Sequence, residues 1–157
     1  MSAPDPAGLA RLVPELLVAD HARSLAFYEA LGFRRLWGRD EEGFSYLDRE
    51  GAQVMIEEVD PEGRNWVAAP LEAPFGRGMN LEIACGDATA LRDRVVAAGL
   101  ALFLPLEDRW YRAGGHEIGV RQFIVQDPDG YLLRFSEDRG VRPPAPERRL
   151  SHGRFTG

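Results

Sequence analysis

Charged side chains lie inside three stretches of the sequence that otherwise have the composition of buried strands. Glu15 lies in VPELLVAD, Glu82 in NLEIAC and Arg134 in YLLRFSE. Buried charges must be paired or solvated, so we expect Arg134 to form an ion pair with Glu15 or Glu82. Two other chemistries stay open here. Two close carboxylates raise one pKa and transfer protons, and a guanidinium binds the carboxylate of a substrate.

Large aromatic side chains lie in stretches that we predict to be loops. Trp66 lies between two strand-rich halves of the chain, and Trp110 and Tyr111 lie in LEDRWYRAGGHEI. At the mouth of a cleft such rings stack on planar ligands and cap cations, although rings in loops also simply pack against the protein. The remaining aromatic residues fit core packing between a helix and a sheet: Phe27, Tyr28, Phe44, Tyr46 and Phe123.

An internal repeat indicates the elements that position these side chains. VPELLVADHARSLAFYEALGF and NLEIACGDATALRDRVVAAGL each predict a short strand, a helix cap, a helix and a terminating glycine. Asp20 and Asp87 are 67 residues apart, and so are Gly32 and Gly99. An aspartate accepts hydrogen bonds from the free N–H groups at a helix start, and a glycine adopts the left-handed conformation past its end.

The repeat continues into the strands that follow each helix. GFSYLDREG (43–51) matches QFIVQDPDG (122–130) at an offset of 79 residues, so the second copy has gained twelve residues, which we assign to the LEDRWYRAGGHEI loop. Each half reads β-α-β-β-β, which predicts an α+β fold of tandem βαβββ modules. We predict a first module over 10–60, a linker over 61–78, a second module over 79–138 and a flexible tail over 139–157, with the modules forming one domain.

The composition indicates a globular protein with an acidic surface. The 157 residues are 45% hydrophobic and carry a formal net charge of −6. This charge disfavours nucleic-acid binding and suits a cationic small ligand. The single cysteine, Cys85, cannot form an internal disulfide. Neither a signal pattern nor an apolar stretch long enough for a membrane is recognisable, so we expect a cytoplasmic protein without a membrane partner.

Two stretches carry a family resemblance. SLAFYEALGF (24–33) resembles the first-helix signature of the vicinal oxygen chelate superfamily, and DPDGYLLRF (127–135) resembles its last-strand signature. This superfamily includes glyoxalase I, extradiol dioxygenases, fosfomycin-resistance enzymes and bleomycin-resistance proteins. The resemblance spans about residues 12–137 and implies two modules whose curved mixed sheets enclose a cleft. It also implies a homodimer, with the cleft near or across the interface.

Most enzymes of this superfamily hold a divalent metal in the cleft, with a histidine in a first strand and a glutamate in a last strand. Carried onto this sequence, the first-strand positions are Val13 and Asn80, and the last-strand positions are Met55 and Arg134. None of these is a suitable ligand, and the arginine would repel a cation. We therefore expect neither a metal nor another cofactor.

The replaced ligand positions favour binding over catalysis. The resemblance is closest to the metal-free bleomycin-resistance-type branch, which implies a non-catalytic protein that binds and sequesters a large, planar, cationic antibiotic. An alternative is a metal-independent enzyme of the same fold that acts on a small oxo or hydroxy acid, with Arg134 as a carboxylate clamp. A structural or regulatory module without a ligand is a third possibility. We assign no catalytic residue, and the predicted ligand-binding residues are Glu15, Met55, Glu57, Trp66, Asn80, Glu82, Trp110, Tyr111 and Arg134.

Overall fold

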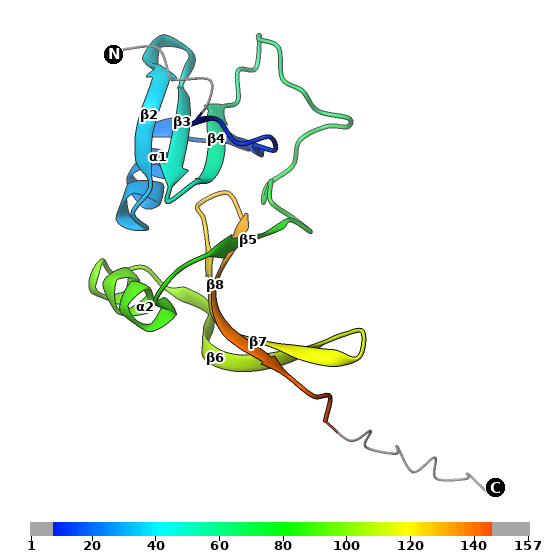
Figure 1. Cartoon of the computed structure of the whole chain (residues 1–157). Helices are drawn as coiled ribbons and strands as arrows, with labels where there is room; N and C mark the ends of the chain where they lie inside the picture. Colours follow the sequence, from blue (N-terminus) through cyan, green and yellow to red (C-terminus); the bar gives the residue numbers. More distant parts are fainter. Residues whose placement is uncertain (1–7, 146–157) are drawn as a thin grey trace, which may run out of the picture.

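Two modules with the same order of elements make up the chain. A computed structural model describes residues 8–145. The first module consists of β1 (Glu15–Val18), α1 (His21–Ala30), β2 (Arg34–Arg39), the 3-10 helix η2 (Asp40–Glu42), β3 (Phe44–Arg49) and β4 (Ala52–Glu58). The second consists of β5 (Asn80–Ala84), α2 (Ala88–Ala97), β6 (Leu102–Ala113), β7 (His116–Gln126) and β8 (Leu132–Arg142). The predicted tandem βαβββ fold is thus confirmed (Figure 1).

Both helices begin and end where the sequence predicts. The side chain of Asp20 accepts a hydrogen bond from the backbone N–H of Arg23, and that of Asp87 accepts one from Ala90. Gly99 ends the second helix with a φ of 77°, a conformation that costs glycine little. Each helix has ten residues, and no helix within residues 8–145 is long and apolar enough to cross a membrane.

Each module forms one mixed four-stranded sheet. The strand order is β1-β4-β3-β2 in the first module, called sheet A below, and β5-β8-β7-β6 in the second, called sheet B. The first and last strands of each module are parallel neighbours, with Glu15 opposite Met55 in sheet A and Glu82 opposite Arg134 in sheet B. The two offsets of the repeat, 67 and 79 residues, therefore relate equivalent positions of the two sheets.

The two modules share one hydrophobic core, which lies on the helix-covered side of each sheet. It includes Leu16 and Ile56 of sheet A and Leu133 and Phe135 of sheet B, each at most 1% exposed. The turn before β8 joins the modules, because its buried Asp127 accepts a hydrogen bond from the Tyr28 hydroxyl of α1 at 3.1 Å. The Ser24 hydroxyl and the backbone N–H of Ala19 donate to Asp129 in the same turn.

Two sequence predictions about loops and termini are wrong. The inserted residues form a long β6–β7 hairpin rather than a loop, with Trp110 opposite Gly119 and Tyr111 opposite Ile118. The hairpin extends away from α2 (Figure 1). The predicted tail begins later than residue 139, since β8 continues to Arg142 and pairs there with Glu117. Pairing of β6, β7 and β8 along the hairpin gives partners to backbone N–H and C=O groups that a loop would leave to water. Residues 146–157 of the predicted tail lie outside the described residues.

Candidate functional site

The face of sheet A that points away from the core brings several polar and aromatic side chains together. Alternation along a strand places every second residue on this face, and cross-strand neighbours share it. Its two central rows run across the strands in the registers β2–β3–β4–β1. We call them the sheet-A face; one row contains Arg39, Phe44, Glu57 and Leu17, and the other contains Trp37, Tyr46, Met55 and Glu15.

Three aromatic rings form the centre of the sheet-A face. The Trp37 and Tyr46 rings are stacked at 5.4 Å with 19° between their planes, and the Trp37 and Phe44 rings lie 5.1 Å apart. The prediction that Phe44 and Tyr46 pack between helix and sheet is therefore wrong, although both are buried. Ser45 and Leu47 alternate with them and face the core instead. The stretch FSYLD does not predict this arrangement, because the polar Ser45 lies on the core side and the two aromatic residues lie on the other side.

Two glutamates form a carboxyl pair beside these rings. The Glu57 side chain makes a hydrogen bond with Glu15, which raises the pKa of Glu57 to about 7; partial burial and the negative charge of Glu15 act in the same direction. The positive charge of Arg39 opposes the rise. A hydrogen bond between two carboxyl groups needs a proton on one of them. Near neutral pH both the protonated and the ionised form of Glu57 are therefore populated.

Most polar groups on the equivalent face of sheet B are paired within the chain, although the buried Nε atom of Arg134 has no hydrogen-bond partner within residues 8–145. The Arg134 guanidinium donates to Glu82 at 2.8 Å and to the Gln122 side-chain oxygen at 3.4 Å. The Gln122 amide donates in turn to the Tyr111 hydroxyl at 2.8 Å and to Glu107 at 2.9 Å. We expected Arg134 to pair with Glu15 or Glu82, and the ion pair with Glu82 is the one that forms. The expected ion pair leaves Arg134 neutralised rather than free.

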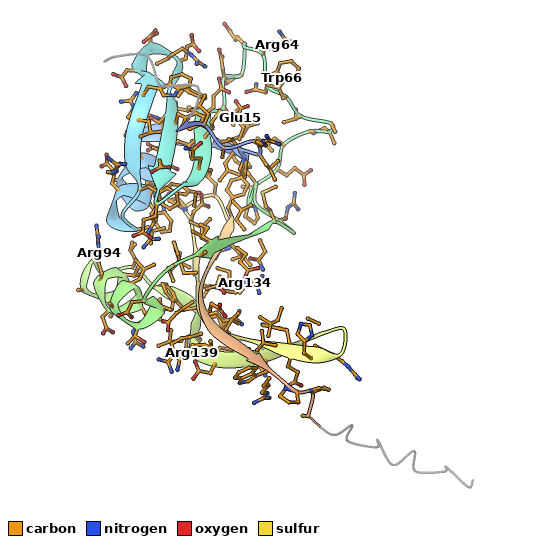
Figure 2. The ribbon with its side chains drawn as sticks, viewed as in Figure 1. Glu15, Arg64, Trp66, Arg94, Arg134 and Arg139 are labelled. Carbon is orange, nitrogen blue, oxygen red and sulfur yellow. The ribbon has the colours of Figure 1, made fainter. Side chains whose placement is uncertain are left out.

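The two predicted stacking tryptophans each lie against an arginine side chain. Trp66 lies on the linker, is 72% exposed and has the Arg64 guanidinium 4.0 Å from its ring centroid (Figure 2). Trp110 contacts Gly119 and the Arg142 guanidinium on the face of sheet B opposite to Arg134, because it alternates with Tyr111 along β6. The tryptophan that lies on the same sheet face as the carboxyl pair is Trp37, which was not among the predicted ligand-binding residues.

The remaining predicted ligand-binding residues lie on the expected strand faces. Met55 is partly buried at the centre of the sheet-A face, opposite Glu15 and Tyr46. Asn80 is exposed at the start of β5, where it lies opposite Leu132. Their role in binding stays a prediction.

The four positions that hold metal in the family do not fit a divalent cation here. Val13 and Met55 offer no hard donor atom, and the charge of Arg134 is already held by Glu82. Asn80 alone offers a single weak oxygen ligand. Within residues 8–145, no three histidine, cysteine or acidic side chains are arranged to hold a metal.

Two hollows elsewhere on the molecule lack comparable chemistry. A groove of about 810 Å³ lies on the helix side, where Phe27 and Phe103 line it and Arg23 reaches it. A smaller cavity of about 270 Å³ lies between the modules and is lined mainly by apolar residues, with Gln53 and Glu82 as its polar groups. Neither contains the paired carboxyl groups and stacked rings found on sheet A.

A family model of the Glyoxalase/Bleomycin resistance protein/Dioxygenase superfamily matches residues 8–135. The chain belongs to this superfamily. Among solved structures it is similar to TioX from Micromonospora sp. ML1, with 25% identity, a TM-score of 0.63 and coverage of 82% of this chain and 98% of that one.

Two further superfamily structures share the fold. A glyoxalase/bleomycin resistance protein/dioxygenase from Alicyclobacillus acidocaldarius is 19% identical, with a TM-score of 0.57 and coverage of 84% and 93%. A lactoylglutathione lyase from Agrobacterium tumefaciens is 13% identical, with a TM-score of 0.54 and coverage of 87% and 96%. A comparison with curated proteins found no match. The superfamily description covers both resistance proteins and enzymes, so the choice between binding and catalysis depends on the site.

Proposed function

We propose that this protein binds and sequesters a planar, cationic small molecule of the antibiotic type, such as a bleomycin-like ligand, without converting it. The observation that carries the proposal is the Glu15–Glu57 carboxyl pair beside the stacked Trp37 and Tyr46 rings on one sheet face. A planar cation is recognised by this combination, since the carboxylates attract its charge and the rings bind its flat surface.

The charge distribution supports a cationic rather than an anionic ligand. The chain has a net charge of −6, which raises the local concentration of cations. On sheet A the partly exposed Arg39 lowers the pKa of Glu57 without cancelling its rise, whereas on sheet B the Arg134 charge is matched by Glu82. These charges support a site for the ligand charge on sheet A, with Trp37 in the stacking role that was predicted for Trp66 and Trp110.

Tryptophan fluorescence tests this assignment when Trp37 is the only tryptophan left. We expect a Trp66→Phe/Trp110→Phe double variant to bind ethidium or bleomycin as the unchanged protein does, with quenching of the remaining Trp37 emission. Titration calorimetry should show that Glu15→Gln/Glu57→Gln lowers the affinity at least tenfold. Absence of both heat and quenching at sub-millimolar ligand concentration would refute the proposed binding function.

A second candidate is a metal-independent enzyme in which Glu57 transfers a proton. The pKa of Glu57, raised to about 7 by Glu15, favours it, because a general acid works best when its pKa lies near the operating pH. Its carboxylate clamp, Arg134, would first have to leave Glu82. Conversion of a small oxo or hydroxy acid that disappears in Arg134→Met would support catalysis; binding of ethidium unaffected by Arg134→Met would support sequestration.

The homodimer implied by the family also stays a proposal. Large apolar side chains on the N-terminal segment and the linker support it, since Leu12 is 84% and Trp66 72% exposed. Such side chains commonly become buried in interfaces. Sedimentation equilibrium of the unchanged protein and of Leu12→Asp should separate a dimer from a monomer.

A further inference from the structure

A cation of the chain itself already lies on the sheet-A face. Arg39 is directly opposite Phe44 in the β2–β3 register. Its guanidinium carbon is 4.0 Å from the centroid of the Phe44 ring and 5.9 Å from that of Trp37. Phe44 is only 3% exposed although it points away from the core, which is consistent with coverage by Arg39 and Trp37. Arg39 therefore makes the cation–π contact that a cationic ligand would make.

The same arginine acts on the carboxyl pair. Glu57 is the cross-strand neighbour of Phe44 on the other side, in the β3–β4 register. The charge of Arg39 lowers the pKa of Glu57, against the rise caused by Glu15. The Arg39 guanidinium thus contacts the Phe44 ring and also lowers the pKa of Glu57 through its charge.

Arg39 also has a partner that does not depend on the rings. Its guanidinium forms an ion pair with Glu42 in η2, a 3-10 helix made only of the acidic residues Asp40–Glu42. The side chains of Arg39 and Glu42 are 39% and 50% exposed, so both reach solvent. An exposed ion pair constrains its members weakly. The guanidinium can therefore leave Phe44 while it keeps an acidic neighbour.

We propose that Arg39 is an internal competitor that a cationic ligand displaces from the Phe44–Trp37 surface, and that it thereby sets the affinity and specificity of the site. This inference rests on the proposed function. A ligand must bind the rings and the Glu15–Glu57 pair better than Arg39 does. Cations of the cell that lack a large stacking surface are then rejected, while a planar cation with such a surface displaces the arginine toward η2.

Calorimetric titration of ethidium into Arg39→Met tests the competition. Methionine keeps an unbranched apolar side chain and removes the charge, so we expect affinity to rise on the order of threefold to tenfold, in keeping with a cation–π contact. Arg39→Lys should fall between the variant and the unchanged protein. Arg34→Met is the matched control, because Arg34 lies on the same strand, is exposed and pairs with Asp48 outside the two rows. Affinity of Arg39→Met that is unchanged or lower overturns the inference.

A measurement without ligand separates failure of this inference from failure of the proposed function. Carbon-13 NMR of the Glu57 carboxyl should show a higher pKa in Arg39→Met than in the unchanged protein, since the opposing charge is gone. An unchanged Glu57 titration means that Arg39 does not act on the pair and overturns the inference alone. A raised pKa without ethidium binding by any variant overturns the proposed function and, with it, the competition.

Discussion

Sheets A and B have the same topology and place a glutamate at the same point of the first strand, yet the two glutamates differ in their surroundings. Glu82 lies opposite Arg134 and forms an ion pair at 2.8 Å. Glu15 lies opposite Met55, which has no charge, and makes its hydrogen bond with Glu57 instead. Two positions on the neighbouring strand thus account for the difference, because sheet B has Arg134 where sheet A has Met55, and Ser136 where sheet A has Glu57.

The difference shows that two modules with the same fold can carry an ion pair on one sheet face and a pair of acidic side chains on the equivalent face. On sheet B the charge of Arg134 is matched by Glu82, and the Gln122 amide links Arg134 to Tyr111 and Glu107. On sheet A the acidic pair retains a proton near neutral pH, and the aromatic rings lie beside it. A pair of like charges is costly unless a proton or a cation joins it. Sheet A is therefore the face on which we propose that a cation binds.

Introducing an arginine into sheet A should erase the difference between the sheets. In Met55→Arg the new guanidinium should pair with Glu15 across β1 and β4, as Arg134 does with Glu82. We expect at least a tenfold loss of ethidium affinity by calorimetry, and a pKa of Glu57 that falls toward its ordinary value in carbon-13 NMR. Met55→Leu should bind as the unchanged protein does. Full affinity in Met55→Arg would show that the ligand cation does not use this pair.

Changing the pH should alter binding on sheet A and leave sheet B unaffected. Glu57 has a pKa of about 7, above its ordinary 4.5, so it is mostly protonated at pH 6 and mostly ionised at pH 8. Affinity for a permanently charged cation such as ethidium should therefore rise roughly tenfold between these values, with release of a proton that calorimetry in two buffers detects. Glu57→Gln should show a flat profile.

The same group gives the stability of the free protein an opposite pH dependence. Because the folded state binds the Glu57 proton more tightly than the unfolded state, this contribution is present below about pH 4.5 and is lost as the pH rises through about 7. Urea unfolding should therefore show that Glu57→Gln loses less stability than the unchanged protein between pH 6 and pH 8. An equal loss in both proteins would mean that Glu57 has no raised pKa.

The two helices also differ, since Tyr28 of α1 joins the modules while its repeat equivalent in α2 is Val95. Tyr28→Phe removes the donor to the buried Asp127, whose pKa is already raised by burial. We expect a loss of about 1 kcal/mol in the free energy of unfolding, measured with urea. Tyr131→Phe, which loses a hydroxyl bond to the Leu17 carbonyl across the same joint, is the comparison variant. Ethidium binding by either variant should not change.

Removing the arginine of sheet B should have the smallest effect. In Arg134→Met, Glu82 loses its partner, but its side chain is 50% exposed and stays hydrated. The free energy of unfolding should fall by less than about 1 kcal/mol in urea titrations. Affinity for ethidium should stay within twofold, because the ligand binds on sheet A. A large loss of binding would place the ligand on sheet B.

Much of the fold was predictable because its signals are local. Capping by Asp20 and Asp87, the glycines after each helix and the repeat offsets depend on short stretches of chain, and they predicted the order of the elements in both modules. The hairpin that contains Trp110 was missed, since glycines and charges in its sequence also suit a loop. Its strands pair with each other, and β8 pairs along β7 as far as Arg142.

The sequence by itself determined the tandem modules, the replaced metal positions and the presence of a glutamate at each first strand, because these depend on residue identity and spacing. The tertiary structure decided which charges meet. Glu15 and Glu57 approach through the parallel pairing of β1 and β4, and Arg39 reaches Phe44 through the β2–β3 register. Pairing between strands that are distant in the sequence cannot be predicted from any short stretch of chain. The register of β6 with β7 places Trp110 on the face of sheet B opposite to Arg134, and the register of β2 with β3 places Trp37 beside Tyr46.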